Sequence, residues 1–179
     1  MSNRRAAFVI LAEDQQQEIV IRRLLKGRGV ERHKISSQIS PRGRHAGEQY
    51  VRERFPIELR TLRRLSFMAK ALLVVTDADT CSVQERESML WTHASAQGVG
   101  QQQDEPVLLC IPRRNIETWI HWLRGRDTDE ETAYPKLPRP GDCNAEIQTL
   151  VRISLNGAAR PLPPSMQLFL DRLNRLLKD

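Results

Sequence analysis

Acidic side chains follow two apolar segments of this chain, and together they could bind a metal ion. Glu13 comes directly after residues 6–12, and Asp77 and Asp79 follow residues 71–76. Both segments are short, apolar and partly β-branched, which is typical of buried parallel strands. Ligands bind at the carboxyl ends of such strands in open α/β sheets, so we expect the carboxylates to meet there. Carboxylate oxygens suit hard cations, and the sequence therefore predicts a Mg²⁺ or Mn²⁺ site for phosphodiester chemistry.

The spacing of Asp77 and Asp79 predicts that both carboxylates can reach the same ion. Residues i and i+2 of an extended segment point the same way. Glu13 can join them only if the two preceding strands are neighbours in the sheet. Three close carboxylates repel one another strongly unless a cation lies between them. Such an ion would polarise a phosphate oxygen and activate water, and Glu13 could instead serve as a general acid or base.

A sheet is needed to bring these acids together, and the hydrophobic pattern predicts one. Strands are expected at residues 6–12, 33–40, 70–76 and 106–111, with helical segments between and after them. Strands that alternate with helices indicate an α/β fold with a Rossmann-like, mainly parallel sheet of about four strands. Helices should cover both faces through right-handed crossovers.

Capping residues and one proline predict where the helices begin and break. Asp14 is expected to cap the helix after the first strand, and Asn115 the helix after the fourth. Ser82 and Glu85 have the spacing of a capping box. Pro56 is expected to interrupt the long helix that precedes the third strand.

The last third of the chain is predicted to be a helical extension. Residues 125–142 are polar and rich in proline, which indicates a long loop. Helices are expected near residues 145–153 and 165–177, the second with a continuous apolar face. We interpret that face as core, with the seam of a homodimer as the alternative. The predicted division is a catalytic domain at 1–125 and an extension at 126–179 packed on the same domain.

The composition is that of a globular protein with an uneven charge. Hydrophobic residues make up 40% and charged residues 28% of 179 residues. No apolar run is long enough to cross a bilayer, and the N-terminus resembles a signal peptide poorly, so a cytoplasmic location is expected. Cys81, Cys110 and Cys143 lack the spacing of a zinc site or a disulfide framework, and buried free thiols are expected.

The positive charge is concentrated in the first part of the chain. Residues 1–70 hold 16 Lys and Arg against 7 Asp and Glu, although the net charge of the whole chain is only +6. A basic surface beside an acidic metal site would draw phosphates toward carboxylates that otherwise repel them. A solvated arginine-rich surface without a partner is the alternative. The side chains predicted to bind phosphate are Arg42, Arg44, Arg113 and Arg114.

Two sequence segments resemble the Toprim family, the catalytic fold of bacterial primases, topoisomerases and overcoming-lysogenization-type nucleases. The segments are FVILAED at residues 8–14 and LLVVTDAD at residues 72–79. Toprim proteins carry a Glu after the first strand and a DxD motif after the third, and these acids bind Mg²⁺. The resemblance implies that role for Glu13, Asp77 and Asp79.

The segment IPRRNIETW at residues 111–119 is similar to a strand-to-helix turn of the overcoming-lysogenization branch. A further acid approaches the metal there, and Glu117 is the matching residue. The resemblance covers residues 5–125 and implies a Mg²⁺-dependent nuclease that acts on DNA rather than RNA, with phage defence as its suggested role. The chain has Asp14 where many Toprim proteins have Gly. It also lacks the GxxxxGK[ST] motif, so an ATPase partner would be a separate chain.

Two other functions remain open from the sequence. A receiver-like signalling domain also places acids after strand one and a phospho-accepting Asp after strand three, as Glu13, Asp14 and Asp77 would be here. Receivers need a Lys after the fifth strand, and Arg113 is the closest basic residue. The other alternative is a non-catalytic partner whose basic half binds nucleic acid or another protein.

Overall fold

A four-stranded parallel sheet forms the centre of the molecule in the computed structural model, which describes residues 7–41, 47–65 and 70–178. The strand order is β2-β1-β3-β4, and every neighbouring pair is parallel. The Rossmann-like α/β fold predicted from the sequence is thereby confirmed. The strands are β1 (Ala7–Ala12), β2 (Ile35–Ile39), β3 (Lys70–Val75) and β4 (Val107–Cys110).

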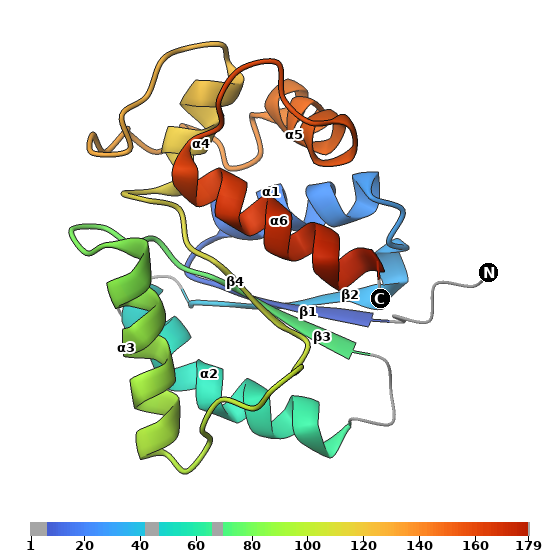
Figure 1. Ribbon diagram of the computed structural model, residues 1–179, viewed down its shortest axis with the longest axis vertical. Helices are drawn as coiled ribbons and strands as arrows, with labels where there is room; N and C mark the ends of the chain where they lie inside the picture. The colour runs from blue at the N-terminus through green and yellow to red at the C-terminus, as the bar shows by residue number, and fades with distance from the viewer. Residues whose placement is uncertain (1–6, 42–46, 66–69, 179) are drawn as a thin grey trace.

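Helices cover both faces of the sheet (Figure 1). Helices α2 and α3 lie on one face, and α1, α4, α5 and α6 lie on the other. A short 3-10 helix, η1 (Arg32–Lys34), precedes β2. The helices are α1 (Gln15–Gly27), α2 (Gly47–Arg64), α3 (Val83–Ala96), α4 (Ile116–Leu123), α5 (Asn144–Asn156) and α6 (Pro164–Lys178).

Side chains along each strand point alternately to the two faces of the sheet, and each face has its own hydrophobic core. Leu73 of β3 packs into the core beneath α1 and α6, whereas its neighbours Leu72 and Val74 pack beneath α2 and α3. All three are at most 1% exposed. Successive strand residues point to opposite faces, so both faces of a central strand must be apolar when helices cover both. This explains why β3 reads as an unbroken apolar run.

Two of the predicted helix caps are confirmed and one is wrong. Asp14 Oδ1 accepts a hydrogen bond from the Gln17 backbone N–H at 2.9 Å, and Ser82 and Glu85 form the reciprocal capping box. Asn115 stands at the N-cap of α4, but its side chain makes no cap hydrogen bond. Its amide nitrogen instead donates to the Tyr134 carbonyl at 2.6 Å, because a loop distant in sequence reaches it.

The predicted break at Pro56 is also wrong, because α2 continues through this residue. Pro56 lacks the N–H that would bond within the helix, which is a cost to helix stability. Val51, Phe55 and Leu59 on the same helix are fully buried and offset that cost. The ring of Phe55 also contacts Trp91 of α3 edge to face, with centroids 4.9 Å apart.

The C-terminal helices pack onto the face that α1 covers. Arg28, just after α1, donates to Asn174 Oδ1 of α6 at 2.6 Å, and Trp119 of α4 stacks on Phe169 of α6. The apolar face of α6 is buried in this core, as expected. Residues 126–142 contain no helix or strand, which confirms the predicted loop.

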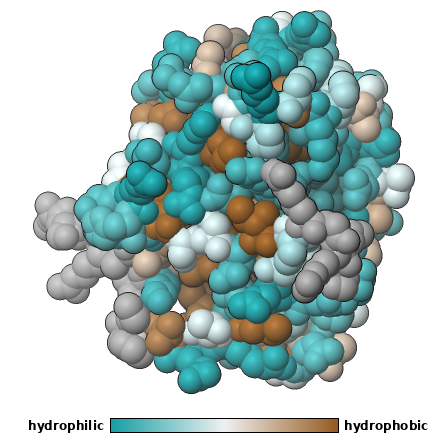
Figure 2. Space-filling view, turned by 180° about the vertical axis from the view of Figure 1, so that it is seen from behind, coloured by the Kyte–Doolittle hydropathy of each residue, from teal (hydrophilic) through white to brown (hydrophobic). Residues whose placement is uncertain are grey.

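The surface and the cysteines can be compared with what the composition predicted. Figure 2 shows a mostly hydrophilic face on which apolar residues form several separate areas. None of the helices in the described residues is both long and apolar enough to cross a membrane. All three cysteines are free, as expected. Cys110 and Cys143 are also buried, but the predicted burial is wrong for Cys81, which is only half-buried.

We predict that Leu73→Ala lowers the free energy of unfolding by about 3 kcal/mol, because it leaves a cavity between the sheet and α6. Urea denaturation followed by circular dichroism measures this change. Ile57→Ala, on the exposed side of α2 with 44% exposure, serves as the control and should change stability by no more than about 0.5 kcal/mol. Equal effects of the two substitutions would contradict the position of Leu73 in the core.

Candidate active site

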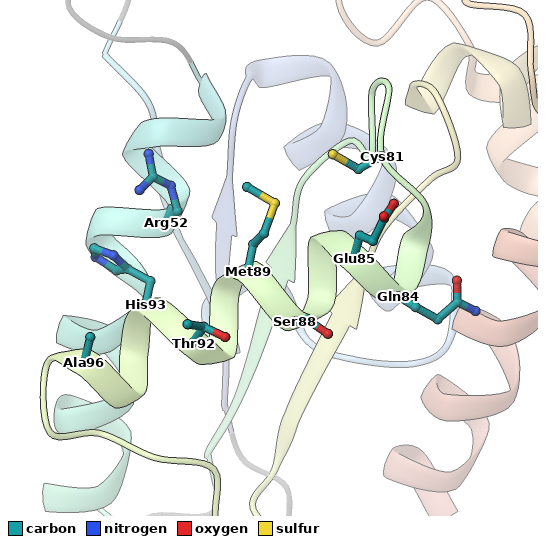
Figure 3. A pocket seen from close by; sticks show the side chains of 9 residues that line it. All are labelled: Arg52, Cys81, Gln84, Glu85, Ser88, Met89, Thr92, His93 and Ala96. Carbon is teal, nitrogen blue, oxygen red and sulfur yellow. The ribbon is translucent and has the colours of Figure 1, made fainter.

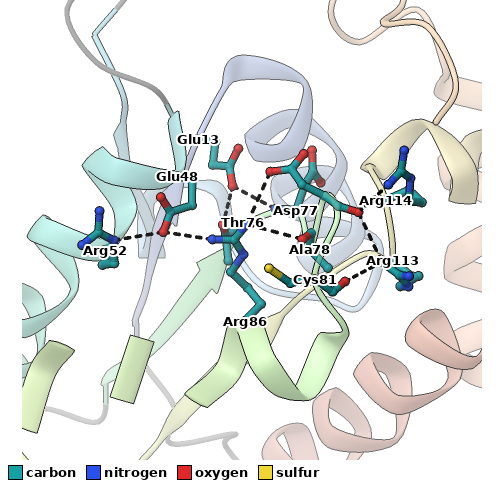
Figure 4. Close-up of polar contacts among 11 residues, drawn as sticks. Glu13, Glu48, Arg52, Thr76, Asp77, Ala78, Cys81, Arg86, Arg113 and Arg114 are labelled. Carbon is teal, nitrogen blue, oxygen red and sulfur yellow. Dashed lines mark hydrogen bonds and ion pairs between the residues drawn. The ribbon is translucent and has the colours of Figure 1, made fainter. Parts of the chain in front are cut away.

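The register of the sheet brings Glu13 to the motif that follows β3. Ala12 at the end of β1 lies opposite Val75 at the end of β3. The side chain of Glu13 then crosses to the neighbouring strand, where its Oε1 accepts from the Asp77 backbone N–H at 2.9 Å and from the Thr76 hydroxyl (Figure 4). The expectation that the two strands are neighbours is confirmed, and Glu13 faces the aspartates.

Asp77 is a buried carboxylate with an unpaired oxygen. It is 7% exposed, and its Oδ1 makes no hydrogen bond with any residue that the structure describes. Burial, followed by the nearby charges of Glu13 and Glu117, raises the pKa of Asp77 well above its ordinary value. A buried carboxylate in this state needs either a proton or a cation.

Glu117 is a second buried carboxylate. It lies in the first turn of α4 and is 1% exposed, and neither oxygen has a hydrogen-bond partner on another side chain in the described part of the chain. Burial raises its pKa, and so does the negative charge of Asp14, whereas its own backbone N–H and the charge of Lys136 lower it. A carboxylate that only stabilises the start of a helix would remain solvated, so this role does not explain its burial.

Asp79 does not lie as the extended geometry predicted. Its backbone has a φ of 54°, in the left-handed region, and its side chain is 58% exposed. The carboxylate turns toward Arg86 of α3, with Oδ2 3.4 Å from Nη2. The expectation that Asp77 and Asp79 point the same way is therefore wrong, because the chain leaves the extended conformation between them.

Arg86 is a buried cation that no motif in the sequence indicated as a site residue. It is 5% exposed and also pairs with Glu48 of α2, with Nη1 3.0 Å from Oε1. Glu48 in turn pairs with Arg52 at 3.1 Å, as Figure 4 shows. The positive charge of Arg86 thus partly balances the carboxylates of Asp79 and Glu48. Arg86 reaches both acids only because α3 packs against α2.

The donor set suits a hard cation, although the side chains do not surround one as they stand. Every candidate ligand is a carboxylate, and Asp77 and Glu117 offer buried oxygens that no protein group occupies. However, in the part of the chain described, no three Asp, Glu, His or Cys side chains are grouped closely enough to hold an ion. Coordination would require Asp79 to turn away from Arg86 and toward Asp77.

The environment of Glu13 makes it a titratable group near neutral pH. Its pKa is raised from 4.5 to about 7, chiefly because the carboxylate is buried. The hydrogen bonds from Thr76 and Asp77 lower the pKa, and the charges of Asp79 and Asp14 raise it. Glu13 is therefore only partly ionised near pH 7 in the metal-free protein.

The predicted phosphate-binding arginines are not all free to bind phosphate. Arg113 and Arg114 both donate to the Asp79 carbonyl, at 3.2 and 3.0 Å, so they hold the turn that carries this acid. Arg113 also pairs with Glu131 at 3.1 Å. Arg42 and Arg44 lie outside the described residues. Phosphate binding by these four side chains stays a prediction.

Much of the positive charge in the first part of the chain is paired within the protein. Arg22 pairs with Glu18 at 2.5 Å, Arg54 with Glu58 at 2.8 Å, and Arg63 with Glu105 at 2.6 Å. These pairs use donors that a nucleic-acid surface would need. Glu18 and Glu58 are already counted in the net charge of +9 of residues 1–70, so among these pairs only the one with Glu105 offsets a charge of that excess.

A cavity of about 400 Å³ opens beside Glu13. Gly47, the first residue of α2, lies against this side chain, and a Cβ atom added there would be 2.7 Å from the Glu13 Cβ. Any larger residue at this position would displace Glu13, so a glycine is needed for the close approach. The lining includes Glu13, Asp14, Ser40, Pro41, Gly47 and Lys136.

A second groove, of about 790 Å³, runs along the outer side of α3 (Figure 3). Met89, Thr92 and His93 of α3 line it, together with Arg52 of α2. Glu13 lines the cavity of about 400 Å³ but not this groove, whose surface is mostly apolar. We therefore assign the chemistry to the edge beside Glu13 and not to this groove.

Comparison of the chain with models of known protein families, with curated proteins and with solved structures found no match. The Toprim resemblance therefore stays an expectation from the sequence segments. We call the end of the sheet that carries Glu13, Asp14, Asp77, Asp79 and Glu117 the acidic edge. Its geometry carries the argument for function.

We predict that the metal-free protein loses about 2 kcal/mol of unfolding free energy between about pH 5 and about pH 8. A carboxyl group whose pKa is higher in the folded state stabilises the fold while protonated, and this contribution disappears as the pH rises through the folded pKa of about 7. Urea denaturation in EDTA across this range measures the loss.

In the same experiment Glu13→Gln should give a shallower decline, because glutamine is neutral at every pH. Glu53→Gln, which changes an exposed carboxylate of α2, is the matched control and should keep the wild-type slope. A wild-type profile that is flat, or equal slopes for wild type and Glu13→Gln, would contradict the environment assigned to Glu13.

Proposed function

We propose that the protein is a Mg²⁺-dependent nuclease of the Toprim type that cleaves phosphodiester bonds of nucleic acid. The observation that carries this proposal is three buried carboxylate oxygens, Asp77 Oδ1 and both oxygens of Glu117, which have no hydrogen-bond partner among the other described residues. Asp77 also lies next to Glu13, whose carboxylate accepts from its backbone N–H. Burying such groups unpaired costs several kcal/mol, so their retention favours a ligand that compensates for them. A hard divalent cation is the ligand that suits oxygen donors.

The residues divide into ligands and groups that position them. Glu13, Asp77 and Asp79 would hold Mg²⁺ or Mn²⁺, with Glu117 as a further acid on the α4 side. When bound, the ion would supply Lewis-acid stabilisation of a phosphate and activation of water. Thr76 and the Asp77 backbone N–H fix the Glu13 carboxylate, while Arg113 and Arg114 hold the turn that presents Asp79.

The substrate and partners proposed follow from the resemblance. DNA is favoured over RNA, and an ATPase would act as a separate subunit in a defence system. The cytoplasm is the proposed location. A homodimer is also proposed, and it would have to use a surface other than the apolar face of α6, which lies within the core of the same chain.

A receiver-like function is less well supported by the geometry. The order β2-β1-β3-β4 could be extended to the five strands of such a domain, yet none of the residues described after β4 forms a fifth strand. Asp77, the acid that would accept a phosphoryl group, is only 7% exposed. Phosphoryl transfer to this residue would first require it to become accessible.

A non-catalytic nucleic-acid or protein-binding role has one observation in its favour. Asp79 pairs with Arg86 instead of turning toward Asp77, so the carboxylates do not surround an ion as they stand. In this alternative Arg86 would replace the metal as the compensating charge. The two functions differ in whether the protein binds Mn²⁺ and cleaves nucleic acid.

We predict that Asp77→Asn and Glu13→Gln each reduce nucleic-acid cleavage by about 1,000-fold, since each removes a ligand to the ion that stabilises the transition state. Cleavage of plasmid DNA, single-stranded DNA and RNA is measured in Mg²⁺, Mn²⁺ and EDTA. Asp171→Asn, on the exposed side of α6, is the matched control and should retain wild-type cleavage.

Circular dichroism and Mn²⁺ titration separate loss of chemistry from loss of fold. Both active-site variants should remain folded and bind Mn²⁺ more weakly than wild type. Undiminished cleavage by both variants would refute the proposed site. Wild-type protein that binds nucleic acid, yet neither binds Mn²⁺ nor cleaves, would favour the non-catalytic role.

A further inference from the structure

A loop outside the Toprim resemblance lies across the acidic edge. We name residues 126–142 the strap; it connects α4 to α5 without a helix or strand of its own. Loops of this length without regular structure are uncommon in compact domains and are usually functional or disordered. The contacts of the strap show that it is fixed to the domain.

The strap is attached near its beginning, its middle and its end. Glu130 is 7% exposed, and its carboxylate accepts from the backbone N–H and the hydroxyl of Ser165 at the start of α6. The ring of Tyr134 stacks on His121 with centroids 4.1 Å apart. At the other end, the Gly141 carbonyl accepts from Arg23 of α1 at 2.7 Å.

These attachments place one lysine at the acidic edge. Lys136 Nζ is 2.6 Å from Asp14 Oδ2, although the residues are 122 positions apart in the chain. Lys136 lines the cavity of about 400 Å³ together with Glu13 and Gly47. Its side chain is 71% exposed and therefore has room to move toward a bound ligand.

The positive charge of Lys136 interacts with the buried carboxylates of Glu117 and Asp77. The hydrogen bond to Asp14 is the main cause of its raised pKa, and the charges of Asp14, Glu117 and Asp77 also raise it. The same ammonium opposes the rise in the pKa of Glu117. Lys136 is thus the positive counterpart, on the α1 and α4 side, of Arg86 on the α3 side.

We propose that Lys136 is the resident counter-cation of the acidic edge and a phosphate contact of the substrate. It stabilises the carboxylates when no divalent ion is present. Once an ion neutralises them, the ammonium leaves Asp14 and binds a phosphate of the nucleic acid in the cavity. The proposal rests on the proposed metal-dependent function and deepens it by naming a substrate-binding residue.

Lys136 is expected to leave Asp14 when a divalent ion binds, because both cations occupy the same group of carboxylates. A divalent ion and a lysine ammonium near the same carboxylates repel each other, so each weakens binding of the other. The Lys136 side chain of this pair is 71% exposed and that of Asp14 is 26% exposed, so solvent weakens the interaction and the lysine can leave it. Asp14 stands where many Toprim proteins have Gly, so the chain supplies its own partner for this lysine.

The test compares wild type with Lys136→Met, which removes the charge and keeps most of the length of the side chain. Mn²⁺ alone is the first probe, titrated by calorimetry at low ionic strength without nucleic acid. We expect the variant to bind Mn²⁺ about fivefold more tightly, since a competing cation is gone. The rise in melting temperature on adding Mn²⁺ should also be larger for the variant.

A DNA duplex is the second probe, bound in Ca²⁺ and in EDTA at several salt concentrations. In Ca²⁺ the slope of log affinity against log salt should be smaller for the variant by about one, as expected for one lost phosphate contact. In EDTA the two proteins should have equal slopes, because Lys136 is then held by Asp14.

Lys34→Met is the matched control. Lys34 is also ion-paired, with Glu31 at 2.8 Å, but it lies just before β2, at the amino end of the strands. The Lys34→Met variant should match wild type in both measurements. Equal Mn²⁺ affinity of wild type and Lys136→Met would overturn the counter-cation role, and equal slopes in Ca²⁺ would overturn the phosphate contact. A wild-type protein that binds no Mn²⁺ would instead refute the proposed function itself.

Discussion

The structure depends on one constraint, the placing of several carboxylates at the carboxyl edge of the sheet. Glu13 crosses from β1 to β3 and accepts from Thr76 and the Asp77 backbone, which fixes one acid beside another. Such an arrangement is unfavourable without compensation, because burial and like charge both oppose ionisation. The raised pKa values of Glu13 and Asp77 express this cost. A stable core must therefore hold the edge in place.

Both faces of the sheet contribute to that compensation. From the α2 and α3 side, Arg86 joins Asp79 and Glu48. From the α1 and α4 side, the strap brings Lys136 to Asp14. Between these cations, Asp77 Oδ1 and both oxygens of Glu117 have no hydrogen-bond partner among the other described residues. Arg86 and Lys136 thus pair with the outer acids Asp79 and Asp14, and the inner acids are the ones that the proposed ion would compensate.

The arginine content is explained by structure more than by a binding surface. Arg22 pairs with the buried Glu18 one turn earlier on α1, and Arg63 of α2 pairs with Glu105, which precedes β4. Arg113 and Arg114 bind the Asp79 carbonyl. A count of charges along the chain cannot separate these roles, because pairing depends on contacts between residues far apart in sequence. The cavity beside Glu13 is therefore a more specific indication of a ligand than the net charge.

The α/β fold and the meeting of Glu13 with Asp77 could be predicted from residue patterns alone. Apolar strand patterns and local caps such as Asp14 are short-range signals, and parallel strands must end at a common edge. The left-handed turn at Asp79, the continuity of α2 through Pro56 and the approach of Lys136 could not be predicted in this way. Each of these depends on packing or charge pairing between segments distant in the chain, where long-range contacts override local preference.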